Sequence, residues 1–285
     1  MRTLIALLAL GAMAVPAIAE ELFYEPFGYE AGTNLAAHTG SHPGWWPIDT
    51  GKPNNHPQTI QAGSLTYAGF VASDGNSTIR EGGSEQQQGL TYSFASKGSI
   101  TTGTVYVGFL VEVHDISTAN STAKYNRVMR AADRGIDGSA DWMSSFFSIS
   151  QDPGEASRYK FGLHGAGTVD EAYTDDSWIA GDPANPFAQG THLVVWATDL
   201  DAEKVMLWVD PDPTATSPGV PDVTVDTDAA AMTSVSLIEY GNYPTFVVDE
   251  MRVATDYAHA IGIPEPASIA LLALGGLVVL RRRRR

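Results

Sequence analysis

The chain has 285 residues, 17 Lys and Arg against 33 Asp and Glu, a formal net charge of −16, and no cysteine. The acidic balance argues against a nucleic-acid-binding protein, and the lack of Cys excludes disulfides, thiol catalysis and Cys-ligated metal sites. With 28 Gly, 16 Pro and only 18% charged residues, the composition favours an all-β domain rich in turns.

The first 19 residues have the three parts of a secretory signal peptide. Arg2 supplies a positive charge, residues 4–15 form an apolar run, and Ala17 and Ala19 form an Ala-x-Ala ending. We therefore predict export through the Sec machinery and cleavage after Ala19. A buried N-terminal helix is the alternative, but it does not explain why two acidic residues follow the Ala-x-Ala ending directly.

Residues 20–262 are predicted to form one β-sandwich domain. Runs rich in β-branched and aromatic residues recur, and Gly, Pro, Asn and Asp separate them. The clearest runs are residues 90–94, 102–114, 142–150, 158–163, 191–198, 204–209, 234–240 and 245–254. In residues 105–113, every second residue is Val or Phe, so one face of this strand is expected to be core and the other partly exposed. The pattern predicts a two-sheet antiparallel sandwich.

Four tryptophans in predicted loops or at their borders could contact a glycan. They are Trp45, Trp46, Trp142 and Trp178. Exposed indole rings offer rigid apolar area to a sugar face, whereas a large sandwich can also bury a loop Trp. Both interpretations stay open at this point.

Four aspartates border the predicted hairpin of residues 193–209. Asp199 and Asp201 lie in its five-residue loop, and Asp210 and Asp212 follow its second strand. Their carboxylates could bind Ca²⁺, which prefers oxygen ligands. The alternative is that they cap turns, since Asp side chains accept hydrogen bonds from nearby N–H groups. No other cofactor is predicted.

The C-terminal end has three parts as well. Pro264, Glu265 and Pro266 precede a fourteen-residue apolar segment, residues 267–280, and five arginines end the chain. The segment is at the short limit for a helix that crosses a bilayer, and terminal arginines can extend the span and fix their end on the cytoplasmic side. We predict a transmembrane helix that tethers the exported domain to the inner membrane.

This ending resembles the PEP-CTERM sorting signal, named for the motif present here at Pro264, Glu265 and Pro266. In that family a membrane-embedded exosortase recognises the motif, cuts near it and releases the domain to the cell surface or matrix. The resemblance implies that residues 263–285 are a sorting signal and that an exosortase is a partner. A plain single-span anchor with an incidental pair of prolines is the alternative.

A second resemblance covers nearly the whole domain. Residues 22–29, the hairpin, and residues 246–255 are similar to the opening, late hairpin and closing strand of concanavalin A-like or laminin-G-like jelly rolls attached to PEP-CTERM tails. The resemblance implies a jelly-roll fold. Many jelly rolls of this shape bind glycans, and laminin-G-like relatives often hold a Ca²⁺ ion at a loop rim.

No catalytic residue is predicted. Glycan-cleaving relatives of this fold usually carry Glu-x-Asp-x-x-Glu or Glu-x-Asp-x-Glu on one strand, and the chain has no such run. The nearest candidates are Glu112 with His114, and Asp249 with Glu250. Adjacent strand residues point to opposite faces, which argues against Asp249 and Glu250 as a pair.

We therefore predict an exported surface or matrix protein whose sandwich domain is structural or binds extracellular polysaccharide. A glycan-cleaving enzyme with a non-standard site and a Ca²⁺-dependent adhesin are the alternatives. Without the two terminal segments, residues 20–263 keep 11 basic and 32 acidic residues, so binding to nucleic acid is not expected.

Overall fold

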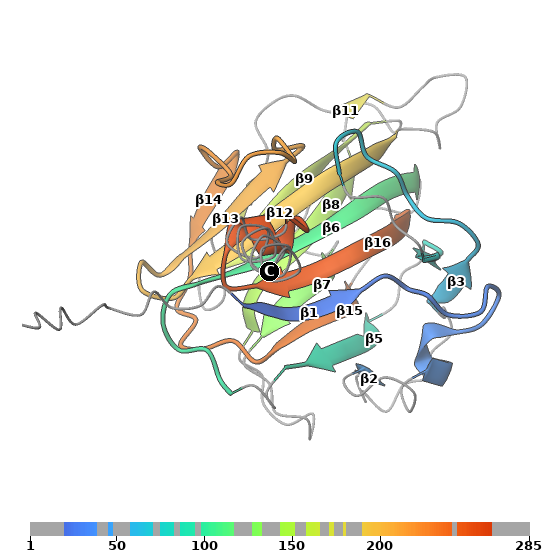
Figure 1. The fold of residues 1–285 in the computed structure, drawn as a ribbon, viewed down its shortest axis with the longest axis horizontal. Coiled ribbons are helices and arrows are strands. Elements are labelled where there is room, and N and C mark those ends of the chain that lie inside the picture. The colour runs from blue at the N-terminus through green and yellow to red at the C-terminus, as the bar shows by residue number, and fades with distance from the viewer. Residues whose placement is uncertain are drawn as a thin grey trace, which may run out of the picture.

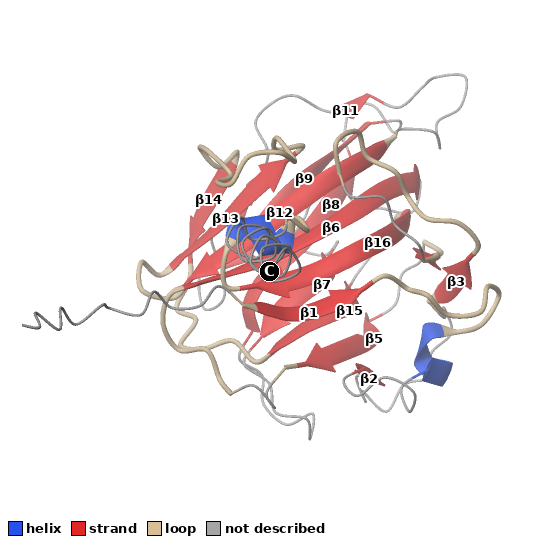
Figure 2. Cartoon of the chain, in the orientation of Figure 1, coloured by secondary structure: helices blue, strands red, loops and turns tan. Residues whose placement is uncertain are grey.

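The computed structural model describes residues 20–38, 45–47, 58–70, 75–82, 86–94, 98–116, 127–132, 143–151, 158–165, 171–173, 179–180, 190–240 and 244–263. These residues form two layers of strands (Figure 1). The short helices η1 (Leu35–His38) and α1 (Tyr257–Ala260) are the two helices among them (Figure 2). The predicted signal peptide, transmembrane segment and Pro-Glu-Pro motif lie outside these residues.

Eight strands form the first sheet, and every strand pair in it is antiparallel. The order is β14 (Val223–Asp226), β13 (Lys204–Val209), β12 (Thr191–Asp199), β6 (Thr104–Asp115), β16 (Thr245–Ala254), β4 (Ser77–Arg80) and β3 (Thr59–Gln61). The eighth strand, β1 (Glu21–Glu25), also pairs with β16. The strands of the predicted hairpin are β12 and β13, so this prediction is confirmed.

The second sheet also has eight strands in antiparallel pairs. The order is β10 (Glu171–Tyr173), β9 (Arg158–Gly165), β8 (Met143–Gln151), β7 (Arg127–Ala132), β15 (Ser234–Tyr240), β5 (Gln86–Ser93) and β2 (Trp45–Pro47). The short strand β11 (Ile179–Ala180) pairs with β9. The predicted fold, an all-β sandwich of two antiparallel sheets, is confirmed.

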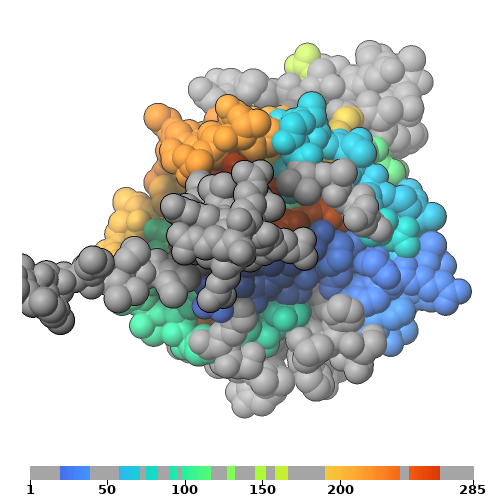
Figure 3. Space-filling model, in the orientation of Figure 1, coloured from blue at the N-terminus to red at the C-terminus, as the bar shows by residue number. Residues whose placement is uncertain are grey.

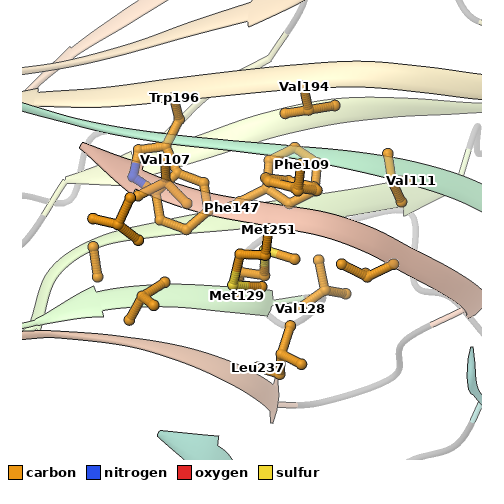
Figure 4. Packing of buried hydrophobic residues seen from close by; sticks show 14 of the residues in the cluster. Val107, Phe109, Val111, Val128, Met129, Phe147, Val194, Trp196, Leu237 and Met251 are labelled. Carbon is orange, nitrogen blue, oxygen red and sulfur yellow. The ribbon is translucent and has the colours of Figure 1, made fainter. Parts of the chain in front are cut away.

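Large apolar side chains from both sheets fill the space between them (Figure 4). Phe109 and Trp196 of the first sheet are fully buried, as is Phe147 of the second. The rings of Trp196 and Phe147 stack with centroids 6.2 Å apart, and the ring of Phe109 meets Phe147 edge-on at 5.3 Å. Each buried ring contributes on the order of 2 kcal/mol or more through loss of apolar surface to water, so this cluster holds the sheets together.

The chain itself covers the outer face of the first sheet. Leu110, Leu193 and Trp208 form a second apolar cluster there with Tyr257 and Ile261, which belong to α1 and the turn after it. Residues 62–70 and 210–222 also lie on this side of the molecule (Figure 3). The expectation that the second face of residues 105–113 is partly exposed is therefore corrected at Leu110, which is 1% exposed.

A β-bulge in β16 places two adjacent carboxylates on this same outer face. Between Asp249 and Arg252, two residues of β16 oppose one of β6, and Glu250 has a φ of 53°. Asp249 accepts a hydrogen bond from the backbone N–H of Leu65 at 2.8 Å. Glu250 accepts hydrogen bonds from Tyr24 at 2.8 Å and from Arg252 at 3.2 Å. The prediction that Asp249 and Glu250 point to opposite faces was wrong, because the bulge shifts the alternation by one residue.

Stability should rise as the pH falls through neutrality, in part because of Asp249. Burial raises the pKa of Asp249 to about 7, and the nearby Glu250 carboxylate adds to this. The folded state therefore takes up a proton, and the stabilisation, at most about 4 kcal/mol, is present below pH 4 and is lost as the pH rises through 7. Asp249→Asn should flatten the difference in Tm between pH 5 and pH 8, whereas Asp228→Asn, at an exposed position, should not. An equal slope in both variants would contradict this assignment.

Candidate functional site

The outer face of the second sheet carries a row of polar and aromatic side chains that crosses five strands. Strand register places next to one another, in order, Thr91, Ser236, Arg130, Phe146 and His164. Each is less than one-tenth exposed. The residues beside them in their strands belong to the core between the sheets: Leu90, Val235, Leu237, Met129, Ala131, Phe147 and Leu163. Because strand residues alternate, the row points away from the core.

Side-chain contacts link the row in two parts, one of Thr91, Ser236 and Arg130 and the other of Phe146 and His164. The hydroxyls of Thr91 and Ser236 lie 2.8 Å apart, and Arg130 Nη2 donates to Ser236 Oγ at 3.4 Å. The rings of Phe146 and His164 meet edge-on with centroids 6.3 Å apart. A row tied together in this way presents hydrogen-bonding groups at fixed positions on a rigid sheet.

Further cationic groups lie next to this row. Arg127 places its guanidinium carbon 3.9 Å from the centroid of the Phe146 ring and pairs by register with Ser148. Lys160 pairs by register with Ser150. Arg158 and Lys160 alternate with core residues of β9, so both lie on the outer face. We call the following residues the polar face: Thr91, Arg127, Arg130, Phe146, Ser148, Ser150, Arg158, Lys160, His164 and Ser236.

Two hydroxyls of the polar face lack a hydrogen-bond partner. Ser148 Oγ and Ser150 Oγ are fully buried, and the structure gives neither of them a partner among the described residues. A buried hydroxyl without a partner costs roughly 1–3 kcal/mol. Because β8 residues alternate, both hydroxyls point to the side of the sheet that carries Phe146.

Charge is distributed unevenly between the two sheets. The strands of the first sheet contain eight Asp and Glu and three Lys and Arg, whereas those of the second contain two Glu and four Lys and Arg. No described side chain of the polar face is a carboxylate. Four of the seven Lys and Arg residues in the described ranges lie on the polar face, and the backbone of Glu171 in β10 pairs with His164 at its edge.

The structure describes the predicted glycan-contact tryptophans only in part. Trp45 and Trp46 belong to β2, and the backbone of Trp46 pairs with Thr91, so β2 extends the sheet that carries the polar face. Their side chains, and all of Trp142 and Trp178, lie outside the described residues. Glycan contact by these four residues stays a prediction.

The four predicted calcium ligands do not converge. Asp199 Oδ1 accepts backbone hydrogen bonds in the hairpin loop, and Asp201 Oδ2 accepts one from Gly103 at 3.0 Å. Asp210 and Asp212 lie at the other end of β13, whose six residues span about 20 Å. Within the described parts of the chain, no three acidic or His residues form a group able to hold a metal.

The carboxylates at the far end of β13 have local partners. Asp210 accepts a hydrogen bond from the backbone N–H of Leu193 at 3.1 Å, and its second oxygen lies 2.8 Å from His192 Nδ1. Asp212 accepts from both the N–H and the hydroxyl of Thr214. These contacts are the turn-capping role that the sequence left as the alternative.

Glu112 and His114 form a pair on the first sheet, away from the polar face. His114 Nε2 lies 3.1 Å from Glu112 Oε1, and the Thr191 hydroxyl donates to Glu112 at 3.2 Å. The hydrogen bond with His114 holds the pKa of Glu112 below its ordinary value. A carboxylate that two neighbours keep ionised suits an ion pair. Glycan cleavage usually needs a second carboxylate nearby, and none is described beside Glu112.

Sequence reasoning missed the residues of the polar face. The signal was available: Ser148 and Ser150 alternate with Phe147 and Ile149, and Arg158 and Lys160 alternate with Tyr159 and Phe161. An alternation with a polar half that contains cations marks a strand whose second face is not core. The alternation does not reveal that β7, β8 and β15 are neighbours and that their polar residues share one face, because strand pairing is set by tertiary structure.

Several solved structures are similar to this chain at low sequence identity. The globular domain of T. cruzi calreticulin has 10% sequence identity and a TM-score of 0.49, covering 93% of this chain and 100% of that chain. An endo-β-1,4-glucuronan lyase from the fungus Trichoderma reesei has 12% identity and a TM-score of 0.43, covering 84% and 97%. An endo-β-1,3(4)-glucanase of family GH16 has 14% identity and a TM-score of 0.44, covering 85% and 96%.

The C-terminal end matches a protein-family model. Comparison with curated proteins gives no match. None of the helices in the described parts of the chain is long and apolar enough to cross a membrane, and the predicted segment 267–280 lies outside them. Residues 262–285, which include Pro264, Glu265 and Pro266, match the PEP-CTERM protein-sorting motif. The chain therefore carries a PEP-CTERM sorting motif, which marks it as an exported protein processed by an exosortase, behind an all-β domain of two antiparallel sheets.

Proposed function

We propose that this protein is a glycan-binding component of the cell surface or extracellular matrix, and that it binds glycan on the polar face. The observation that carries the proposal is the difference between the two outer faces. The chain covers the outer face of the first sheet with apolar side chains, whereas the outer face of the second sheet carries a largely buried row of hydroxyl, guanidinium, imidazole and phenyl groups.

The chemistry of the polar face suits a sugar. Sugar hydroxyls donate and accept hydrogen bonds, and Arg130 and Ser236 offer complementary groups on adjacent strands. Phe146 adds an apolar ring of the kind on which a sugar face can pack. The hydroxyls of Ser148 and Ser150 are fully buried and have no partner among the described residues, so a ligand could satisfy them only if the groups that cover them moved aside.

The sorting motif supports the proposed location. An exosortase substrate is exported with a C-terminal membrane anchor that is later removed, which brings the sandwich domain to the polysaccharides outside the cell. With 11 basic and 32 acidic residues in residues 20–263, self-repulsion favours the solubility of such a domain. Export, cleavage and glycan binding would then be successive steps for one chain.

The double variant Ser148→Ala and Ser150→Ala separates binding from stability. Removal of two hydroxyls without partners should leave Tm unchanged or raise it, whereas affinity for the glycan should fall at least about tenfold. Binding is measured by titration calorimetry with the full-length chain in detergent, using the ligand that a glycan array identifies. Ser145→Ala is the matched control, because the Ser145 hydroxyl faces the core and lies 3.3 Å from the Thr198 hydroxyl; it should lose about 1 kcal/mol of stability and bind the glycan as the parent does.

The same preparations should be assayed for new reducing ends. An array without any retained glycan would contradict the proposal, as would a double variant that binds as tightly as the parent. Release of reducing ends would instead favour the glycan-cleaving alternative, and it would have to disappear in the double variant if the polar face carried the reaction.

A further inference from the structure

We infer that the outer face of the first sheet faces the membrane surface as long as the protein is anchored there. The inference concerns the precursor, before an exosortase removes the anchor that the sorting motif implies, and it does not depend on glycan binding. It is carried by the place at which the chain leaves the folded domain, and by the short stretch of sequence between that place and the apolar segment.

The last described residue, Ile263, is held against this outer face. Its backbone N–H donates to the carbonyl oxygen of Ala258 at 2.8 Å, and its side chain packs against the second apolar cluster. The preceding residue, Gly262, has a φ of 74°, and a Cβ atom there would lie 3.2 Å from Nε of Arg252 in β16. The chain therefore follows the sheet closely up to residue 263.

The chain leaves the domain near the middle of this face. A Cβ atom on Gly108 of β6 would lie 2.1 Å from the carbonyl oxygen of Ala260, so α1 lies directly on β6. β6 is the fourth of the seven strands from β14 to β3, and Figure 2 shows α1 in front of the middle strands. Since neighbouring strands are about 4.8 Å apart, either edge of the sheet is about 14 Å away.

The sequence after Ile263 allows only a short reach. Four peptide links join Ile263 to Ala267, the first residue of the apolar segment, and even fully extended they span at most about 14 Å. The apolar segment is itself at the short limit for a bilayer, so it cannot lengthen this link.

This reach excludes the opposite orientation of the domain. To place the second sheet against the membrane, the chain would have to reach an edge of the first sheet and then pass both sheets, which are about 10 Å apart, a path of roughly 24 Å or more. Four links cannot span it. The outer face of the first sheet must therefore lie against the membrane surface.

The loop of residues 210–222 lies on the same side and carries an apolar tip. Val220 is 89% exposed, more than any other large apolar side chain among the described residues. It follows Gly219, whose carbonyl oxygen accepts a hydrogen bond from Trp208 of the second apolar cluster at 3.3 Å. The same loop contains three aspartates, which anionic lipids do not attract. The short link, rather than charge, thus holds this face at the membrane, and cleavage should release it.

The test uses single-cysteine variants, because the chain has no Cys of its own and one engineered Cys carries one fluorescent label. The full-length chain is reconstituted in phosphatidylcholine vesicles that contain lipid with a nitroxide on its headgroup, which quenches nearby labels. Labels at Ala258→Cys and Val220→Cys mark the outer face of the first sheet, and a label at Lys160→Cys marks that of the second. Quenching at the first two should be at least about threefold stronger, because both sheets separate Lys160 from the membrane.

Insertion of about twenty Gly and Ser residues between Ile263 and Pro264 is the control. A flexible link of this length has an end-to-end distance of about 25 Å, so the domain can turn and most of the difference between the labels should disappear. Arg158→Cys replaces Lys160→Cys should the latter fail to fold. Equal quenching at all three labels without the insertion, or the strongest quenching on the second sheet, would overturn the inference. A difference that persists after the insertion would also overturn it, because the face would then bind lipid without the short link.

Discussion

Replacing Pro264 and Glu265 with Ala should leave nearly all of the exported chain uncut. The sorting-motif match covers residues 262–285, and these two residues belong to the Pro-Glu-Pro sequence after which the family is named. Without them the exosortase should not recognise the substrate, so the apolar segment and the five arginines stay attached. The uncut form would be larger on an immunoblot and would remain in the membrane fraction.

The matched control replaces a Pro and a Glu within the sandwich domain, Pro218→Ala with Glu30→Ala. This control should be processed like the parent, because neither residue lies in the sorting segment. Normal processing of the Pro264 and Glu265 variant would contradict the sorting role. Equal accumulation of uncut chain in both variants would point to a folding defect instead.

Replacing Gly108 with Ala should destabilise the domain by about 2–3 kcal/mol. Gly108 lies in β6, at the centre of the first sheet, and a Cβ atom there would lie 2.1 Å from the carbonyl oxygen of Ala260. The clash is with the backbone of the last residue of α1, so no flexible side chain can move aside. To relieve the clash, either α1 must move away from β6, which leaves Tyr257 and Ile261 less well packed, or β6 itself must shift.

Urea denaturation of the full-length chain in detergent measures this loss. Gly28→Ala is the matched control, since nothing lies within 4 Å of its added Cβ and Gly28 does not have a positive φ. The control should change the free energy of unfolding by less than about 1 kcal/mol. Equal stability of the two variants would mean that the turn after α1 does not pack on β6 as described.

Strand positions could be predicted from the sequence where alternation is long and strongly apolar. β13, β15 and β16 have the predicted bounds. β6 begins and ends within two residues of its own predicted bounds, 102 and 114. Short strands escaped prediction, because two or three residues such as those of β10 and β11 contain too few positions to show a period. Their pairing with β9 comes from tertiary contacts.

The bulge at Asp249 and Glu250 shows why local rules fail at particular positions. Alternation predicts opposite faces for adjacent residues, but one extra residue in β16 turns both carboxylates toward the outer face. Nothing in the sequence of β16 marks the bulge by a Gly, since Glu250 itself adopts the positive φ. Hydrogen bonds from Tyr24 and Arg252 hold Glu250 in place; Arg252 is two residues away in β16, whereas Tyr24 comes from β1, far away in the sequence.

The site was predictable only in its general chemistry. Aromatic and acidic residues stand out in a sequence, so Trp46 and Asp210 attracted attention, whereas Ser148 and Arg130 are unremarkable until register brings them to one face. Asp210 proved to cap β12 through Leu193. A carboxylate in a turn looks the same in sequence whether it binds a metal or a backbone N–H, and only its contacts distinguish the two.

The most direct test of the account is a crystal structure of the exported protein with the oligosaccharide that the glycan array identifies. The account predicts sugar oxygens within hydrogen-bond distance of side chains of the polar face, with Arg130 or Ser236 among them. A sugar bound on the first sheet or at the loops that contain Asp199 and Asp210, with the polar face unchanged, would contradict it.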